Sequence, residues 1–143
     1  MLYTPLTRAA MKLCFAAHEG QLDKAGVPYV NHPLHVAEQM RTEAETCAAL
    51  LHDVLEDADA TEADLRAAGM PDEVVGAVVL LTHDPAVPYL DYVRACKANP
   101  IARAVKIADL EHNSDLSRLE EVTPRDLARI ERYAKALEIL RRF

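Results

Sequence analysis

The apolar residues of the chain recur mainly at the three- and four-residue spacing of amphipathic helices. Valine and isoleucine in residues 71–83 and 100–113 would also suit strands, but the residues around them lack the period-two alternation that strands show. The pattern therefore predicts helices only. Eight helical segments are expected, at residues 5–19, from residue 31, at 43–56, 61–69, 71–83, 88–98 and 100–113, and from residue 124.

Several of the predicted helices begin with residues that cap helix N-termini. Threonine before proline is one such start, and threonine with aspartate three residues later resembles a capping box. These starts are Thr4-Pro5, Asn31 with Pro33 in its first turn, Thr61 with Asp64, and Thr123-Pro124. With 143 residues and no visible linker or repeat, the sequence predicts one all-α domain over residues 1–143. We expect a single compact bundle of about seven or eight helices.

The composition is that of an ordinary globular protein, with 50% hydrophobic and 27% charged residues. The net charge of −7 repels phosphate backbones and anionic lipid, which argues against a nucleic-acid or membrane-surface binder. The longest apolar run, residues 74–81, is far shorter than the ~18 to 20 residues that span a bilayer. Three cysteines without a CxxC pair suit a reduced compartment, so we expect a cytoplasmic protein with buried thiols.

Polar side chains interrupt the predicted apolar helices at three places. His32 stands at the start of the second helix, the pair His52-Asp53 breaks an aliphatic run, and Asp109 lies in the apolar helix over 100–113. Burying such groups without partners costs ~1 to 3 kcal/mol or more each. A shared metal ion would provide one partner for all four, whereas a purely structural explanation needs a separate partner for each.

The spacing around the His-Asp pair is suited to metal chemistry. On one continuous helix over residues 43–56, His52 and Glu56 are neighbours four residues apart, as are Asp53 and Asp57. His52 and Asp53 point about 100° apart around such a helix, so they can share an ion only if it lies between their two faces. The natural completions are His32 and Asp109. Two imidazoles and two carboxylates form a donor set suited to Mn²⁺, Fe²⁺ or Zn²⁺.

Five motifs follow one another in an order that resembles a known family. They are His18-Glu19-Gly20-Gln21, KAGVPYVNHP at 24–33, LLHDVLED at 50–57, Leu81-Thr82, and VKIAD at 105–109 followed by His112-Asn113. Together they closely resemble the hydrolase domain of the RelA/SpoT family, a branch of the HD-domain metal-dependent phosphohydrolases. The match runs to about residue 115 and no synthetase domain follows it, so the resemblance is to small stand-alone alarmone hydrolases.

The resemblance implies a role for each matching residue. The implied ligands of a divalent metal, usually Mn²⁺, are His32, His52, Asp53 and Asp109. Glu56 and Asp57 match an acidic pair that orients and deprotonates the attacking water, and Lys24 and Asn113 match positions that line the substrate pocket. The implied reaction is hydrolytic removal of the 3′-pyrophosphate from guanosine tetra- and pentaphosphate.

A phosphate substrate has to be reconciled with the acidic balance of the chain. Four of the 23 acidic residues belong to the expected site, and a divalent ion would neutralise at least two of those charges. Lys24 and Lys106 would add local positive charge. We therefore expect a compact, metal-dependent site for a small-molecule nucleotide, with Lys24, Lys106 and Asn113 as substrate-binding residues. The sequence leaves the oligomeric state open.

Three residues depart from the family pattern. Asp23 and Leu110 stand where basic residues are usual, and Ala25 stands where a serine is usual. The metal chemistry is kept while recognition residues differ, so one alternative is an HD phosphohydrolase for another nucleotide, such as an adenine alarmone, NADPH or a nucleoside monophosphate. A second alternative is a nucleotide-binding module without turnover. Against it, Glu56 and Asp57, which a degenerate enzyme is expected to lose, are present.

Overall fold

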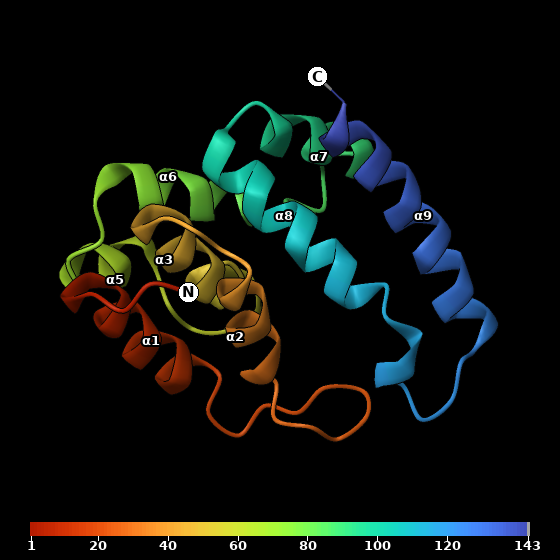
Figure 1. Cartoon of the computed structure of the whole chain (residues 1–143), viewed down its shortest axis with the longest axis horizontal. Helices are drawn as coiled ribbons and strands as arrows, with labels where there is room; N and C mark the ends of the chain where they lie inside the picture. The colour runs from red at the N-terminus through yellow and green to blue at the C-terminus, as the bar shows by residue number, and fades with distance from the viewer. Residues whose placement is uncertain (143) are drawn as a thin grey trace.

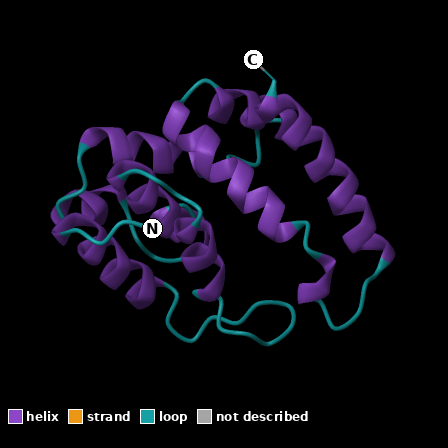
Figure 2. Ribbon diagram, viewed as in Figure 1, coloured by secondary structure: helices purple, strands orange, loops and turns teal. Residues whose placement is uncertain are grey.

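The regular structure of the protein is helical throughout the part of the chain that the structure, a computed structural model, describes (residues 1–142; Figures 1 and 2). The all-α prediction is therefore confirmed. The helices are α1 (Pro5–Ala17), α2 (Asn31–Glu38), α3 (Glu43–Leu51), α4 (Val54–Asp57), α5 (Glu62–Ala67), α6 (Asp72–Leu81), α7 (Tyr89–Lys97), α8 (Pro100–Asn113), the 3₁₀ helix η1 (Leu116–Arg118) and α9 (Pro124–Arg141).

Capping side chains fix most of the predicted helix starts. Thr4, Thr61 and Thr123 cap their helices as predicted, and each accepts a hydrogen bond from the backbone N–H three residues later. The reciprocal capping box predicted for Thr61 is present, and boxes also form at Thr4 and Thr123. The prediction that Asn31 caps α2 is wrong. Asn31 is the first residue of that helix, the cap position is Val30, and no side chain caps it.

The helix expected over residues 43–56 is interrupted, and this is the main correction to the predicted fold. The first part, α3, ends at Leu51, and α4 begins only at Val54. At the break, the Nδ1 atom of His52 lies 2.6 Å from the carbonyl oxygen of Ala49, which belongs to the last turn of α3. The imidazole thus satisfies one of the carbonyls that a helix end leaves free. The side chains of His52 and Asp53 meet at this break, with His52 Nε2 3.1 Å from Asp53 Oδ2.

The helix α3 lies at the centre of the apolar core. Five consecutive residues of it, 47–51, are fully buried, and it contacts α1, α2, α6 and α8. Alanines occupy two of these five positions, which lets the neighbouring helices approach closely. The three cysteines, Cys14, Cys47 and Cys96, are free and buried, as expected from their apolar surroundings.

The last helix, α9, packs against α7 and α8 along the side opposite to α1 (Figure 1). Ala136 and Leu140 face this contact and are fully buried, whereas Leu127 near the start of the helix is 53% exposed. The first turns of α9 therefore stand away from the core, where they face the loop between α1 and α2. Among the described helices, none is both long and apolar enough to cross a membrane.

Candidate metal centre

Four side chains from separate parts of the chain converge at one point. His32 comes from the first turn of α2, His52 and Asp53 from the break between α3 and α4, and Asp109 from α8. The Nε2 atom of His32 lies 2.8 Å from Asp109 Oδ1 and 3.9 Å from Asp53 Oδ2. The Nε2 atom of His52 lies 3.1 Å from Asp53 Oδ2 and 3.5 Å from Asp109 Oδ1. The structure thus brings together the four residues predicted as metal ligands.

The imidazole of His52 shows that these residues fit a metal ion. Its Nδ1–H donates to the Ala49 carbonyl, which leaves its Nε2 atom facing the carboxylates of Asp53 and Asp109. This Nε2 atom is buried and has no hydrogen-bond partner among the described residues. Burial would lower the pKa of His52, but Asp53 and Asp109 outweigh it and raise that pKa, so the site favours positive charge at this point. A divalent cation held by these side chains would supply that charge.

His32 is oriented by a second histidine. Its Nδ1 atom lies 2.7 Å from the Nδ1 atom of His112, and His112 in turn stacks on His35, with ring centroids 3.9 Å apart. Burial and the nearby Arg118 lower the pKa of His112 to about 4. His112 is therefore uncharged near neutral pH and can accept the Nδ1–H of His32, which points His32 Nε2 toward Asp109 and the other converging side chains.

Asp109 is held in its ionised form by its neighbours. The ammonium of Lys106 lies 2.9 Å from Oδ2, and the amide of Asn113 donates to Oδ1 at 3.0 Å. Burial alone would raise the pKa of Asp109, but Lys106 and the two imidazoles outweigh it and hold that pKa well below its usual range. Lys106 is itself buried, and its ammonium lies 5.1 Å from the centre of the Tyr92 ring. The ammonium therefore already pairs with Asp109, one of the four predicted metal ligands.

Asp53 has a partner that the sequence did not reveal. The hydroxyl of Tyr29, in the loop before α2, donates to Asp53 Oδ2 at 2.6 Å. Burial would raise the pKa of Asp53, but the neighbouring His52 outweighs it and lowers that pKa. No spacing rule links Tyr29 to an aspartate 24 positions later, and tyrosine before a helix is a common loop residue.

Glu56 and Asp57 stand at the exposed rim of the centre. One carboxylate oxygen of Glu56, one of Asp57 and one of Asp53 all lie within 4.8 Å of one another. Oε1 of Glu56 accepts the backbone N–H of His83 at 2.9 Å. Partial burial, with a smaller contribution from the neighbouring carboxylates, raises the pKa of both side chains. Raised carboxyl pKa values suit groups that accept a proton near neutral pH.

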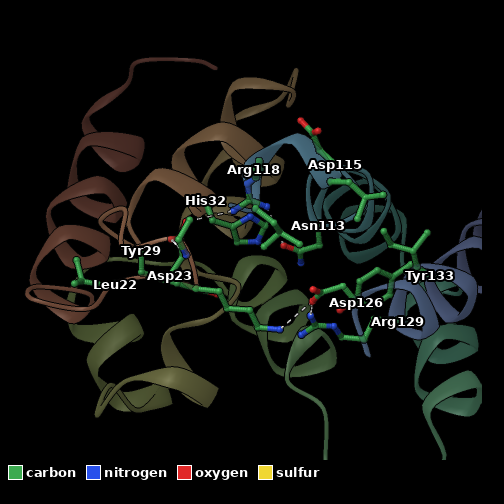
Figure 3. Close-up of a pocket in the computed structure, with 15 residues that line it drawn as sticks. Leu22, Asp23, Tyr29, His32, Asn113, Asp115, Arg118, Asp126, Arg129 and Tyr133 are labelled. Carbon is green, nitrogen blue, oxygen red and sulfur yellow. Dashed lines mark hydrogen bonds and ion pairs between the residues drawn. The ribbon is translucent and has the colours of Figure 1, made fainter. Parts of the chain in front are cut away.

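Two cavities meet at this centre. The first cavity, of about 320 Å³, extends from His32 to η1 and α9. The second cavity, of about 350 Å³, contains Asp53, Glu56, Asp57 and Asp109 in its walls, together with Lys106 and Arg132. Figure 3 shows side chains from the α1–α2 loop, the end of α8 and the start of α9 around the first cavity. Three residues line both cavities: Tyr29, Asn113 and Tyr133.

Lys24 lies apart from the four converging side chains. It lines the first cavity, where its ammonium stands 3.7 Å from Asp126 of α9 and its side chain is 58% exposed. Asn113, by contrast, touches Asp109 and faces both cavities. Of the three predicted substrate-binding residues, Lys24 thus belongs to the first cavity, Lys106 to the second and Asn113 to both.

A family model described as the HD domain matches residues 10–83, which is just over half of the chain. The chain belongs to the HD-domain family. The matched residues include His32, His52 and Asp53, whereas Asp109 lies beyond them on α8. The fourth of the converging side chains, Asp109, therefore comes from a helix outside the matched segment.

Known proteins similar to this HD domain confirm the resemblance to RelA/SpoT-type hydrolases. Guanosine-3′,5′-bis(diphosphate) 3′-pyrophosphohydrolase MESH1 of Mus musculus is 37% identical over 122 residues, which cover 73% of this chain and 66% of the mouse protein. A protein of Vibrio cholerae named guanosine-3′,5′-bis(diphosphate) 3′-pyrophosphohydrolase is 54% identical over 55 residues, which cover 36% of this chain and 8% of that protein. The HD-domain chain thus spans only part of these curated relatives.

A solved structure resembles this HD domain along almost its whole length. It was described under the words "A metazoan ortholog of SpoT hydrolyzes ppGpp and plays a role in starvation responses". The match has a TM-score of 0.78 and 27% sequence identity, and it covers 99% of this chain and 88% of the other. The likeness therefore includes α8 and α9, which lie outside the family-model match.

Proposed function

We propose that the chain is a metal-dependent phosphohydrolase that removes the 3′-pyrophosphate from guanosine tetraphosphate or a closely related nucleotide. The observation that carries this proposal is the unpartnered Nε2 atom of His52, buried between two carboxylates and next to the rim pair Glu56 and Asp57. The names of the mouse and Vibrio relatives support the reaction type. The similar solved structure belongs to a protein described as hydrolysing ppGpp, which supports that nucleotide as the substrate.

In this proposal His32, His52, Asp53 and Asp109 hold one divalent ion, and Mn²⁺ is the ion that we propose. Their two imidazoles and two carboxylates are equally compatible with Fe²⁺ and Zn²⁺. When bound, the ion polarises a phosphoryl oxygen and lowers the pKa of water. Tyr29 and His112 hold Asp53 and His32 in the orientation that this requires.

The acidic rim performs the proton transfer. The carboxylate of Glu56 or Asp57 accepts a proton from the attacking water, and the raised pKa of each lets it hold that proton. Arg132 and Lys106 line the same cavity and offset the negative charge that develops on the phosphate. Lys24 and Asn113 contact the remainder of the nucleotide from the first cavity.

Hydrolysis of guanosine tetraphosphate tests this function directly. The purified protein, loaded with Mn²⁺, is expected to release pyrophosphate from it, and Asp53→Ala is expected to abolish the release because a ligand is lost. Failure to hydrolyse any phosphate ester under these conditions would contradict an enzymatic function and would favour a nucleotide-binding module.

A second candidate keeps the metal chemistry and changes the nucleotide. Asp23 and Ala25 line the first cavity and Leu110 lines the second, so three positions that depart from the family pattern stand where substrate is recognised. An adenine alarmone, NADPH and a nucleoside monophosphate are the alternatives to compare. A clear preference for the guanosine compound over its adenine analogue would dispose of this candidate.

The wider setting that we propose is a cytoplasmic one. All three cysteines are free and buried, which suits a reducing compartment. The 143 residues would act as one domain whose partner is a small nucleotide rather than a nucleic acid or a membrane, because the acidic balance of the chain repels both.

A further inference from the structure

The first cavity contains as many carboxylates as cations. Its cations are Lys24, Arg118 and Arg129, and its carboxylates are Asp23, Asp115 and Asp126. Apolar side chains form much of the remaining wall: Leu22, Ala25, Leu116, Leu119 and Ile130. A cavity that binds phosphate normally offers an excess of positive charge or of unoccupied donors. This one offers no excess of positive charge, and each of its three cations stands beside an acceptor of the protein.

Arg118 is engaged by acceptors of the protein itself. Its Nη1 atom donates to the carbonyl of His112 at 3.0 Å and to the side-chain oxygen of Asn113 at 3.3 Å, and its Nη2 atom stands 3.9 Å from Asp23 Oδ2. Asn113 in turn donates to Asp109. The guanidinium therefore links the loop of Asp23 to the end of α8, and its Nη1 donors are taken by acceptors of the protein.

Lys24 and Arg129 share the buried carboxylate of Asp126. Oδ1 of Asp126 lies 3.7 Å from the ammonium of Lys24 and bonds the guanidinium of Arg129. Oδ2 of Asp126 accepts from the backbone and the hydroxyl of Thr123, each at 2.9 Å, as part of the capping box of α9. Because the capping box fixes this carboxylate beside both cations, it offsets part of the positive charge that a phosphate would meet there.

We propose that the first cavity holds the uncharged nucleoside and does not bind a further phosphate on it. The chain would then hydrolyse a nucleotide that carries phosphate only at the metal centre as well as one that carries a second phosphate group elsewhere. This inference rests on the proposed function for the position of the phosphate at the metal centre. The reaction is unchanged: the water oxygen bonds to phosphorus, the ester bond between phosphorus and the nucleoside oxygen breaks, and that oxygen takes up the proton that the water gives up. Two aspartates set this selectivity. Asp23 acts through Arg118, and Asp126 acts through Lys24 and Arg129.

A matched pair of substrates tests the inference. One is guanosine 3′,5′-bis(diphosphate) and the other is guanosine 3′-diphosphate with a free 5′-hydroxyl. For the Mn²⁺-loaded chain, we expect kcat/KM values that agree within about 3-fold. A preference of more than about 10-fold for the bis(diphosphate) would overturn the inference, because it would mean that the 5′-diphosphate is bound.

Binding of the same two compounds separates this inference from the proposed function. Dissociation constants are measured by calorimetry on Mn²⁺-loaded Glu56→Gln, in which slow turnover is expected, and on the wild-type chain if it hydrolyses neither compound. Similar constants support the inference even if the chain proves not to be a hydrolase. Tighter binding of the bis(diphosphate) by more than about 10-fold contradicts it, and so does failure to bind either compound.

Asp23→Asn tests the role of the ion pair. The side-chain oxygen of Asp23 accepts from the backbone N–H groups of Ala25 and Val27, and asparagine keeps this acceptor while it removes the charge that faces Arg118. We expect kcat/KM for the bis(diphosphate) to rise about 5-fold and that for the 3′-diphosphate to change less than about 2-fold. Equal changes for both substrates would contradict the ion-pair explanation. Glu62→Gln, at the exposed start of α5, removes the same charge elsewhere and should alter neither value.

Discussion

The two cavities that meet at Tyr29, Asn113 and Tyr133 differ in how their charges are held. Around the metal centre, Asp109 and Asp53 receive hydrogen bonds of 2.6 to 3.0 Å from Tyr29, Asn113 and Lys106, and the imidazoles are almost fully buried. In the first cavity, the ion pairs of Lys24 and Arg118 are 3.7 and 3.9 Å long and partly exposed.

This difference indicates that the residues proposed for metal binding and those proposed for substrate recognition tolerate substitution to different degrees. A buried carboxylate with fixed donors cannot change partner without a large cost, so the metal centre admits little variation. Long, partly exposed side chains contribute little to stability and can be exchanged cheaply. The substrate of such a fold can therefore change by substitutions in the first cavity while the metal centre is retained.

Loss of a buried ligand should have the largest effect. We expect Asp109→Ala to remove metal binding measured by calorimetry and to lower kcat/KM by at least about 1000-fold, since it also leaves the ammonium of Lys106 buried without a counter-charge. Circular dichroism shows whether α8 remains folded. Metal affinity close to that of the wild type would mean that the other three side chains suffice, and the rigid picture of the centre would be wrong.

Glu56→Gln should come next, because it removes a proton acceptor and leaves the four converging side chains in place. The expected loss is about 100- to 10,000-fold in kcat, with metal affinity unchanged. The amide oxygen of glutamine can still accept the backbone N–H of His83, so the rim should keep its shape. An unchanged kcat would assign the proton transfer to Asp57 alone.

The pH dependence of the same reaction reports on the same carboxyls. Partial burial raises the pKa of Glu56 and of Asp57, and only the ionised forms accept a proton. Activity should therefore fall as the pH decreases through these raised values, in a pH range above the ~4 that is usual for such groups. A profile of kcat/KM against pH measures this. Glu56→Gln should flatten or displace the acidic limb, and an identical limb in that variant would exclude Glu56.

His112→Phe should weaken metal binding by about 10- to 100-fold. Phenylalanine can keep the stacking on His35 and removes the acceptor for the Nδ1–H of His32, so that the orientation of a ligand is lost. Calorimetric titration with Mn²⁺ measures the change. His35→Phe is the matched control, because it alters the outer ring of the same stack without touching His32. Equal losses in both variants would point to packing instead of orientation.

Lys24→Ala should have the smallest effect. Its ammonium is paired with Asp126 and more than half of the side chain is exposed, so we expect KM to rise by less than about 3-fold, with kcat unchanged. Steady-state kinetics decides this. A 100-fold loss would show that Lys24 leaves Asp126 to bind phosphate, and the contrast between the two cavities would then be lost.

Much of the fold could be predicted because helix starts and helical spacing are local properties. The bounds of α8 agree with the predicted residues 100–113, and three threonine caps were identified from sequence. The break between α3 and α4 could not be predicted, since residues 43–56 keep a helical pattern throughout. At the break the imidazole of His52 bonds a carbonyl of its own helix, a contact that spacing does not reveal.

The four converging side chains could be predicted from the sequence, whereas the character of the first cavity could not. Histidine and aspartate in apolar helices are anomalies that a sequence shows directly, and His32, His52, Asp53 and Asp109 were found in this way before the structure brought them together. Arg118, Asp126 and Arg129 are ordinary charged residues in exposed segments. Only the folded chain places them beside Asp23 and Lys24, so the neutral character of the first cavity could not be predicted.

The common wall of the two cavities offers a basis for inhibitor design. Tyr29, Asn113 and Tyr133 line both the cavity of the proposed metal-binding side chains and a charge-neutral, largely apolar one. A compound that joins a chelating head, such as a hydroxamate, to an uncharged planar ring by a short linker would occupy both sides at once. Such a compound needs no phosphate, so it avoids the high negative charge that keeps nucleotide analogues from entering cells.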